Sequence, residues 1–414
     1  MKTKTPFFSF GPATLVTAAF IGPGTVISAS LAGAHYGYAL LWALVFSVIT
    51  TMVLQEMAAR LGIVTGQGLG ENIRHFFSTP WLRYPLILLI IAAIVIGNSA
   101  YQGGNISGAS MGADALWQNY WPVTALRDSG LANPWALLIG LAATAVLWQG
   151  NYAVLERCLI GLVLIMSLAF LFTLFLSQPD YPALLIGLVK PVLPDGALLS
   201  VIALVGTTVV PYSLFLHAAV SARKWQGSAM DLTQQLAMSN ADIRTAIPLG
   251  GLISVAILST AATAFFGQAQ SINSAADLAR SLQPLAGDAA VWLMAGGLLA
   301  AGISSAITAP LAAAYALNGL VPLSTTQFRA CWLTIIVIGV GLSSAGIKPL
   351  AVIWFAQVAN GILLPVISLT LLVAVNARIM GVYRNSRRQN IVASIVWLLT
   401  LLLSGRSLYL AFFS

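Results

Sequence analysis

The sequence predicts an all-α membrane protein built as an inverted repeat, and three observations lead to this fold class. The chain has 414 residues, of which 59% are hydrophobic and only 7% charged, and its mean hydropathy is +0.90. Soluble domains carry about 25% charged residues. The apolar runs are long and do not alternate as strands do. Proline interrupts two of these runs near their middle, at residues 21–25 and 209–213.

Each apolar run is long enough to cross a bilayer as one helix, which takes about 20 residues. The loops between the runs are short, so we expect one transmembrane domain over residues 1–414 and no separate soluble domain. The first run is too long, and lacks a cleavage site, for a removed signal peptide. The eleven predicted spans are 11–35, 39–62, 84–111, 134–150, 154–177, 196–222, 246–268, 289–320, 330–346, 349–376 and 391–412.

The two interrupted spans are the first and the sixth, which suggests two repeats of five spans each, at about 11–177 and 196–376. An odd number of spans gives the repeats opposite topologies, and residues 391–412 form an extra helix. A broken helix persists in a bilayer where it lines a cavity, because proline removes a backbone donor. Broken helices in corresponding positions of inverted repeats are typical of secondary transporters that work by alternating access. Plain proline kinks are the other interpretation, which Gly22 and Gly24 disfavour at the first break.

Lysine and arginine fall mostly on one side of the predicted spans, and this bias indicates the cytoplasmic side. We therefore expect a bacterial-type inner membrane protein with its N-terminus in the cytoplasm and its C-terminus outside. Arg406, within the last span, is expected to snorkel outward. The other side carries Arg127, Lys190, Arg280 and Lys348, whereas the basic side carries Lys2, Lys4, Arg60, Arg74, Arg83, Arg157, Arg223, Lys224, Arg244, Arg329, Arg378, Arg384, Arg387 and Arg388.

The sequence disfavours several other classes of function. The +8 net charge comes from residues that flank apolar spans, so we expect lipid contacts and no nucleic acid partner. Cys158 and Cys331 match no metal-ligand spacing, and the three histidines form no His-Glu-x-x-His motif. We therefore expect no enzyme activity, no cofactor and a monomeric chain. A channel is the remaining alternative, but interrupted helices around a closed midplane favour a carrier.

Several motifs resemble one known family. The sequence is similar to the natural-resistance-associated macrophage protein (NRAMP) family in the first two spans, in the sixth span and in parts of spans eight and ten. The resemblance covers nearly the whole chain and implies a leucine-transporter-like fold. The matching segments are Gly11-Pro12, Gly22-Pro23-Gly24-Thr25, Ala32-Gly33-Ala34-His35-Tyr36-Gly37-Tyr38, Ala58-Ala59-Arg60-Leu61-Gly62, Pro211-Tyr212-Ser213-Leu214-Phe215-Leu216-His217, Gly297-Leu298-Leu299-Ala300-Ala301-Gly302 and Gln357-Val358.

The resemblance also implies where a cargo would bind. Most members of that family are proton-coupled importers of divalent transition metals, with ligands in both helix breaks and a supporting glutamine in span ten. By position, the family aspartate becomes Gly22, an asparagine becomes Thr25, and the methionine, histidine and second asparagine become Val210, Tyr212 and Ser213. Only the glutamine is retained, as Gln357. The expected cargo-binding residues are therefore Gly22, Pro23, Gly24, Thr25, Val210, Tyr212, Ser213 and Gln357.

All of these side chains are uncharged, which bears on the cargo. Dehydrating a divalent cation without a compensating anion is costly in a low dielectric. The amides at the start of a resumed helix attract anions, and Gly22 and Gly24 allow a ligand to approach the backbone closely. The sequence therefore predicts a small anionic, zwitterionic or polar solute, such as a carboxylate, an amino acid or a bicarbonate-like ion. The alternative is a magnesium- or manganese-type divalent metal cation that stays partly hydrated.

A coupling ion, either a proton or sodium, would make the protein a symporter, and five residues are candidates for its route. The acidic positions of the family in span three fall on about Asn98 and Tyr101. His217 is a candidate proton relay, and Ser304 and Ser305 are candidates for a sodium site. Each also has a structural interpretation, because polar side chains often bond neighbouring helices and serines often allow close helix packing.

Overall fold

The computed structural model describes residues 12–13, 21–76, 80–117, 133–150, 153–268, 272–345 and 347–413. Within them, eight helical segments are long and apolar enough to cross a membrane. The longer helices are α2 Pro23–Tyr36, α3 Leu41–Thr65, α5 Pro80–Trp117, α7 Pro134–Gln149, α8 Ala153–Leu176, α10 Leu198–Thr208, α11 Pro211–Trp225, α12 Leu232–Phe265, α15 Ala290–Leu320, α16 Thr325–Ser344, α17 Pro349–Val375 and α18 Arg387–Phe413.

These helices match the predicted all-α architecture closely. Each predicted span from the second to the eleventh corresponds to one long helix or, for the sixth, to the pair α10 and α11. The first span corresponds to α2 in its second half, while residues 14–20 of its first half lie outside the described residues. The largest difference is α12, which begins at Leu232 rather than near residue 246. Asp231 caps this start by accepting a hydrogen bond from the Gln234 amide at 2.7 Å, so the helix continues through a polar stretch.

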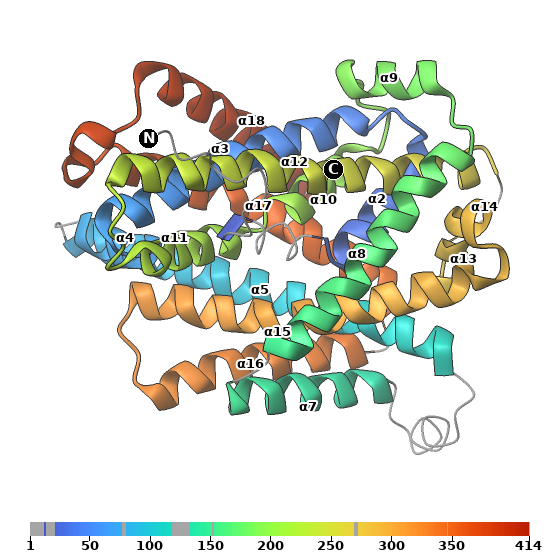
Figure 1. Ribbon diagram of the computed structural model, residues 1–414, viewed down its shortest axis with the longest axis horizontal. Coiled ribbons are helices and arrows are strands. Elements are labelled where there is room, and N and C mark those ends of the chain that lie inside the picture. Colours follow the sequence, from blue (N-terminus) through green and yellow to red (C-terminus); the bar gives the residue numbers. More distant parts are fainter. Residues whose placement is uncertain are drawn as a thin grey trace.

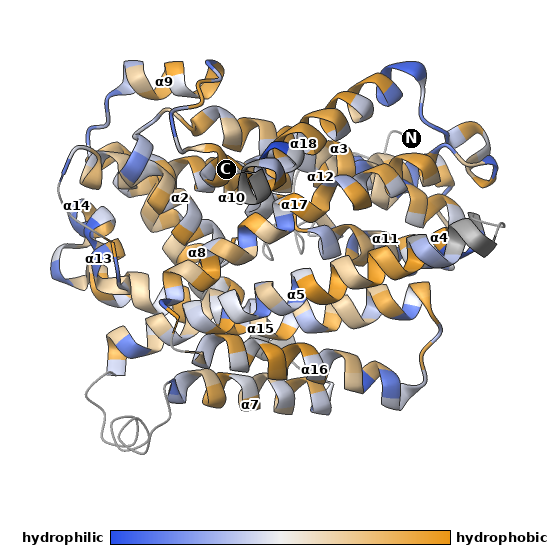
Figure 2. Ribbon diagram, turned by 180° about the vertical axis from the view of Figure 1, so that it is seen from behind, coloured by the Kyte–Doolittle hydropathy of each residue, from blue (hydrophilic) through white to orange (hydrophobic). Residues whose placement is uncertain are grey.

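Short helices fill the connections between the spans, and the sequence patterns did not predict these helices. They are α4 Leu69–Phe76, α9 Tyr181–Val189, α13 Ala275–Ala279, α14 Gln283–Ala286 and the 3-10 turns η1 Arg280–Leu282, η2 Gly287–Ala289 and η3 Arg378–Tyr383. The axes of most long helices lie roughly along the long axis of the molecule, with α4 at one end and α13 and α14 at the other (Figure 1). The hydrophilic residues gather mainly in the connections and at the helix ends (Figure 2).

The helix α5 lies at the centre of this arrangement, between α15, α16 and α17, while α2 packs on α12 and α11 packs on α3. Glycines allow several of these contacts to be very close. Gly302 of α15 lies directly against Ala109 of α5, and Gly206 of α10 lies against the backbone of α17 at Gln357 and Gly361. Side chains larger than hydrogen would separate these helices, so small residues fix the packing.

The second break is a true interruption of the helix. α10 ends at Thr208 and α11 begins at Pro211, while Val209 and Val210 have non-helical backbone angles. The first described helix after the other break begins at Pro23, preceded by Gly22 in an extended conformation with φ −116° and ψ −176°. Proline suits the first position of a helix because that position needs no backbone donor. Both prolines therefore start helices in the middle of the protein.

Candidate functional site

Two helix starts and one helix end meet in the middle of the bundle. The starts of α2 and α11 lie at Pro23 and Pro211, and in neither case does the preceding residue, Gly22 or Val210, supply a side-chain cap. α10 ends just before the second break, and both α2 and α10 pack against α17. Gln357 of α17 lies against Gly24 in the first turn of α2 and against Gly206 near the end of α10.

Gln357 is the centre of this group. Its side-chain amide lies against the Cα atom of Gly24, and its backbone carbonyl lies against Gly206. The Nε2 atom donates a hydrogen bond to the Ile353 carbonyl at 3.4 Å, and the Oε1 atom is buried without a hydrogen-bond partner among the described residues. The predicted residues Gly24 and Gln357 are therefore brought together, with the amide nitrogen nearest to Gly24 and the unpaired acceptor oxygen slightly further away.

A direct contact links the two breaks. The hydroxyl oxygens of Thr25, on α2, and Thr207, on α10, lie 2.9 Å apart, and both side chains are fully buried. Thr25 was a predicted site residue, whereas Thr207 was not. The pair ties the helix that follows the first break to the helix that precedes the second.

A second polar group lies on the opposite side of α11, where this helix packs on α3. Gln55 donates from Nε2 to the Ser213 hydroxyl at 2.8 Å and accepts at Oε1 from His217 Nδ1 at 2.7 Å. The Ser213 hydroxyl in turn donates to the Val210 carbonyl at 2.7 Å, within the break itself. Because the Gln55 oxygen can only accept, the Nδ1 atom of His217 carries the proton. The Nε2 atom of His217 is then a buried acceptor without a partner in the described structure.

The polar run of α5 faces the same interior. Tyr101 packs edge-on against Tyr212 of α11, with ring centroids 5.6 Å apart. Asn98 donates to the Ile94 carbonyl of its own helix at 2.8 Å, and Gln102 donates to the Ala306 carbonyl of α15 at 3.0 Å. The side-chain oxygens of Asn98 and Gln102 are buried without partners among the described residues. One role of Gln102 is thus to join two helices, and the oxygens left over suit a hydrated interior.

Ser304 and Ser305 lie on α15, and Ser305 is buried. The Ser304 carbonyl accepts a hydrogen bond from Thr308 Oγ1 at 3.0 Å. The contacts described for the two serines do not join them to Gln357 or Thr25. The sodium-site prediction for these serines therefore gains no geometric support from the described contacts.

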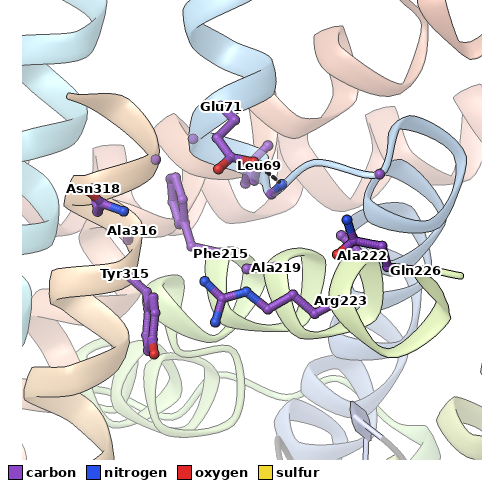
Figure 3. Close-up of a pocket in the computed structure, with 14 residues that line it drawn as sticks. Leu69, Glu71, Phe215, Ala219, Ala222, Arg223, Gln226, Tyr315, Ala316 and Asn318 are labelled. Atoms are coloured by element: carbon purple, nitrogen blue, oxygen red, sulfur yellow. Dashed lines mark hydrogen bonds between the residues drawn. The ribbon is translucent and has the colours of Figure 1, made fainter. Parts of the chain in front are cut away.

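The central group is closed to solvent in this conformation. Thr25 is 0%, Tyr212 1% and Gln357 1% exposed. A cavity of about 210 Å³ opens at the end of the molecule where α4 lies, between α4, α11 and α15 (Figure 3). It is lined by Phe215, Ala219, Ala222 and Arg223 of α11 and by Gln226, which follows that helix.

The cavity follows the face of α11 that carries Tyr212, since residues three and four apart share one face of a helix. Phe215 is the lining residue nearest to Tyr212 along this face, and its side chain is buried. Arg223 lies over the ring of Tyr315 at 4.9 Å, on the opposite wall (Figure 3). The cavity is therefore a vestibule that leads toward the central group and stops at Phe215.

Carboxylates in the described structure serve other contacts. Asp242 is buried and accepts from the Ala13 amide at 2.8 Å, and Glu56 pairs with Arg60 at 2.8 Å. No group of three or more His, Cys, Asp or Glu residues that could hold a metal ion occurs in the described part of the chain. The residues whose contacts with Gln357 are described, Gly24, Gly206 and Ile353, carry no charge.

Sequence reasoning missed Gln55, Thr207 and Asn360. Asn360 follows Gln357 by one helical turn on α17, and its Nδ2 atom is buried without a partner in the described region. Polar residues in predicted spans were the available signal, since Gln55 lies in span two and Thr207 just before the second break. Their partners are distant in sequence, so the pattern of one span alone does not reveal their contacts.

Comparisons with known proteins agree with this architecture. A family model described as natural resistance-associated macrophage protein-like (Nramp) matches residues 13–410. The divalent metal cation transporter MntH of Yersinia pestis is 32% identical over 317 residues, which are 75% of this chain and 72% of the relative. The protein of the same name from Caldanaerobacter subterraneus is 28% identical over 405 residues, covering 97% of this chain and 92% of the relative.

Solved structures show the same fold. A mutant of the Eremococcus coleocola manganese transporter matches with a TM-score of 0.77 at 21% identity, covering 96% of this chain and 85% of that one. MHP1, a nucleobase-cation-symport-1 family transporter in a closed conformation, matches with a TM-score of 0.56 at 15% identity, covering 99% of this chain and 95% of that one. With its interrupted helices and a family match over nearly its whole length, the chain belongs to the natural resistance-associated macrophage protein-like (Nramp) family of secondary transporters.

Proposed function

We propose that this protein is an alternating-access transporter of a divalent metal cation, of magnesium or manganese type, that stays partly hydrated in the site. The observation that carries the proposal is the orientation of the Gln357 amide. Its nitrogen lies nearest to Gly24 and donates to the Ile353 carbonyl, and its oxygen, slightly further from Gly24, is buried without a partner among the described residues. An acceptor oxygen suits a cation or a water molecule bound to it, and repels an anion.

Partial hydration follows from the neutral surroundings. Carbonyl, amide and hydroxyl oxygens stabilise a divalent cation less than carboxylates do, so complete removal of its water would be costly. Magnesium in particular gives up its water reluctantly. The buried oxygen of Asn98, one turn before Tyr101 on α5, also lacks a partner in the described structure and suits a bound water. The names of the relatives, divalent metal cation transporter and manganese transporter, favour a metal over the predicted anionic solute.

The position of the vestibule and of nearby basic residues suggests the path of the cargo and the orientation of the protein in the membrane. Arg223 and the basic residues of η3 and α18 lie at the end where the vestibule opens. By the positive-inside rule this end faces the cytoplasm of a bacterial-type inner membrane. In the closed state Phe215 then separates the central group from the cytoplasm. His217, Asn98 and Tyr101 stay the proposed route for a coupling proton.

Calorimetric titration of the purified protein with manganese and magnesium tests the cargo. We expect saturable binding that weakens at least tenfold in Gln357→Leu. Gln235→Leu is the matched control. Gln235, in the first turns of α12, is also a buried glutamine, but it donates to the carbonyl of Met230, which precedes that helix. Absence of metal binding to the wild-type protein, or equal losses in both variants, contradicts the proposal.

A small anionic, zwitterionic or polar solute is the second candidate. The specific observation in its favour is that neither Gly22 nor Val210 caps the helix that follows it with a side chain, which favours an anion at these helix starts. Their backbone carbonyls do accept, from the Val26 amide at 3.2 Å and from the Ser213 amide at 3.0 Å. The same titration with bicarbonate, an amino acid and a small carboxylate separates the two candidates. Binding of one of these without metal binding replaces the first proposal by the second.

A further inference from the structure

A second cavity, of about 350 Å³, opens at the basic end between α3, α12 and α18. Its polar wall includes Arg244 of α12 and Arg388 of α18, both of them exposed. Neither arginine has an ion-pair partner in the described part of the chain. Two cations without carboxylate partners therefore share one recess at the level where a membrane meets water.

Among the described residues, one acidic side chain lies on the cavity wall, and it is already paired. Glu56 accepts two hydrogen bonds from Arg60, from Nε at 2.8 Å and from Nη2 at 3.0 Å. Arg60 also donates to the Tyr383 carbonyl at 2.6 Å and to the Asn385 side chain. These bonds attach the segment before α18 to α3. They therefore fix where α18 begins, and Arg388 lies in its first turn. The recess keeps a net positive charge and a defined shape.

The inner wall of the recess is apolar and continues toward the middle of the membrane. Met52, Val53, Ile243 and Val392 line it together with the polar groups. One to two turns further along the same helix faces lie exposed apolar side chains. These are Ile49 at 48%, Leu252 at 50% and Ile395 at 51% exposure. A cationic recess is thus continuous with an apolar surface that runs along the helices.

We propose that this recess binds an anionic phospholipid of the leaflet at the basic end, with the phosphate between Arg244 and Arg388. The acyl chain then lies along the apolar surface at Ile49, Leu252 and Ile395. Basic pockets between transmembrane helices on the cytoplasmic side recognise anionic headgroups, and the charge and the apolar continuation both match this ligand. The proposal does not depend on the identity of the cargo, because the recess is separate from the group around Gln357.

The full-length protein in a neutral detergent provides the test, by titration with short-chain phosphatidylglycerol, phosphatidylcholine or inorganic phosphate. The readouts are the thermal unfolding temperature and lipid adducts in native mass spectrometry. We expect phosphatidylglycerol to bind in preference to the other two. In Arg244→Gln/Arg388→Gln its affinity should fall at least tenfold, since each cation near a membrane surface adds several-fold.

The matched control is Arg329→Gln/Arg387→Gln, which removes two arginines from the same end without touching the cavity wall. Its phosphatidylglycerol affinity should stay within about twofold of the wild type. A third variant, Val392→Phe, fills the recess without changing any charge and should also weaken binding. Equal binding of phosphatidylcholine or of inorganic phosphate, or equal loss in the control, overturns the proposal.

Discussion

The hydroxyl groups of Thr25 and Thr207 lie 2.9 Å apart, so a hydrogen bond joins α2 to α10 beside both helix breaks. The two residues are 182 positions apart in the sequence and fall in different predicted repeats. Their contact links the segments at the two breaks beside α17, which carries Gln357. Changes at this contact should therefore affect cargo binding more than overall stability.

Thr207→Val removes the hydroxyl at nearly constant volume. A buried hydrogen bond contributes about 1 kcal/mol, which corresponds to roughly a fivefold change in affinity. We expect manganese binding to weaken by that factor in calorimetry. Thr208→Val is the control, since the Thr208 hydroxyl bonds only the Leu204 carbonyl of its own helix, at 2.9 Å. Equal effects of the two changes would contradict a special role for Thr207.

Gln55→Leu should destabilise the protein and disturb the second break. The change leaves the buried His217 Nδ1 without its acceptor and the Ser213 hydroxyl without its donor, and each loss costs about 1–3 kcal/mol. We expect the thermal unfolding temperature to fall by several degrees, together with slower uptake into vesicles. Thr51→Val, one turn away on α3, removes only a bond to the Ser47 carbonyl and should change little.

Gly24→Ala tests the contact between the first break and α17. An added methyl group would lie 2.7 Å from the Cδ atom of Gln357, so the amide must move away. We expect cargo binding to be lost while the protein still folds, as judged by its elution in size-exclusion chromatography. Gly296→Ala on α15, where a methyl group meets no atom within 4 Å, is the control. Full binding by the Gly24 variant would show that the Gln357 amide does not contact the cargo.

Gly22→Asp places a carboxylate where the resemblance puts the family aspartate. The Gly22 backbone, at φ −116° and ψ −176°, is extended and accepts any residue. If the cargo is a divalent cation, the added charge should tighten manganese binding at least tenfold in calorimetry. Weaker manganese binding, together with lost binding of a carboxylate solute, would instead support the second candidate.

Much of the fold could be predicted because it depends on local chemistry. Proline removes a backbone donor, which predicts the break before Pro211, and apolar runs of sufficient length become spans. The extension of α12 to Leu232 was missed because its polar first turns resemble a loop, and only the cap at Asp231 marks the start. Hydropathy alone does not separate an exposed helix from an exposed connection.

The sequence indicated some of the residues that meet at the breaks but not their connections. The breaks and the family pattern identify Gly24, Thr25 and Gln357, which the structure places in the contacts around the two breaks, while their role in binding a cargo stays a prediction. Gln55 was missed because its partners, Ser213 and His217, are about 160 residues away, at separations of 158 and 162 positions. Hydrogen bonds between distant helices depend on packing geometry, which no single segment encodes.

The attachment of α11 to α3 has a consequence for motion. Gln55 holds Ser213 and His217 on one face of α11, while Tyr212 and Phe215 lie toward the vestibule on another. A swing of α11 that uncovers Tyr212 must either break these buried bonds or carry α3 with it. If α3 moves with α11, the bonds are preserved, so the two helices should move together as one rigid unit. A pair of spin labels, one on each helix, should then report a constant separation throughout the transport cycle.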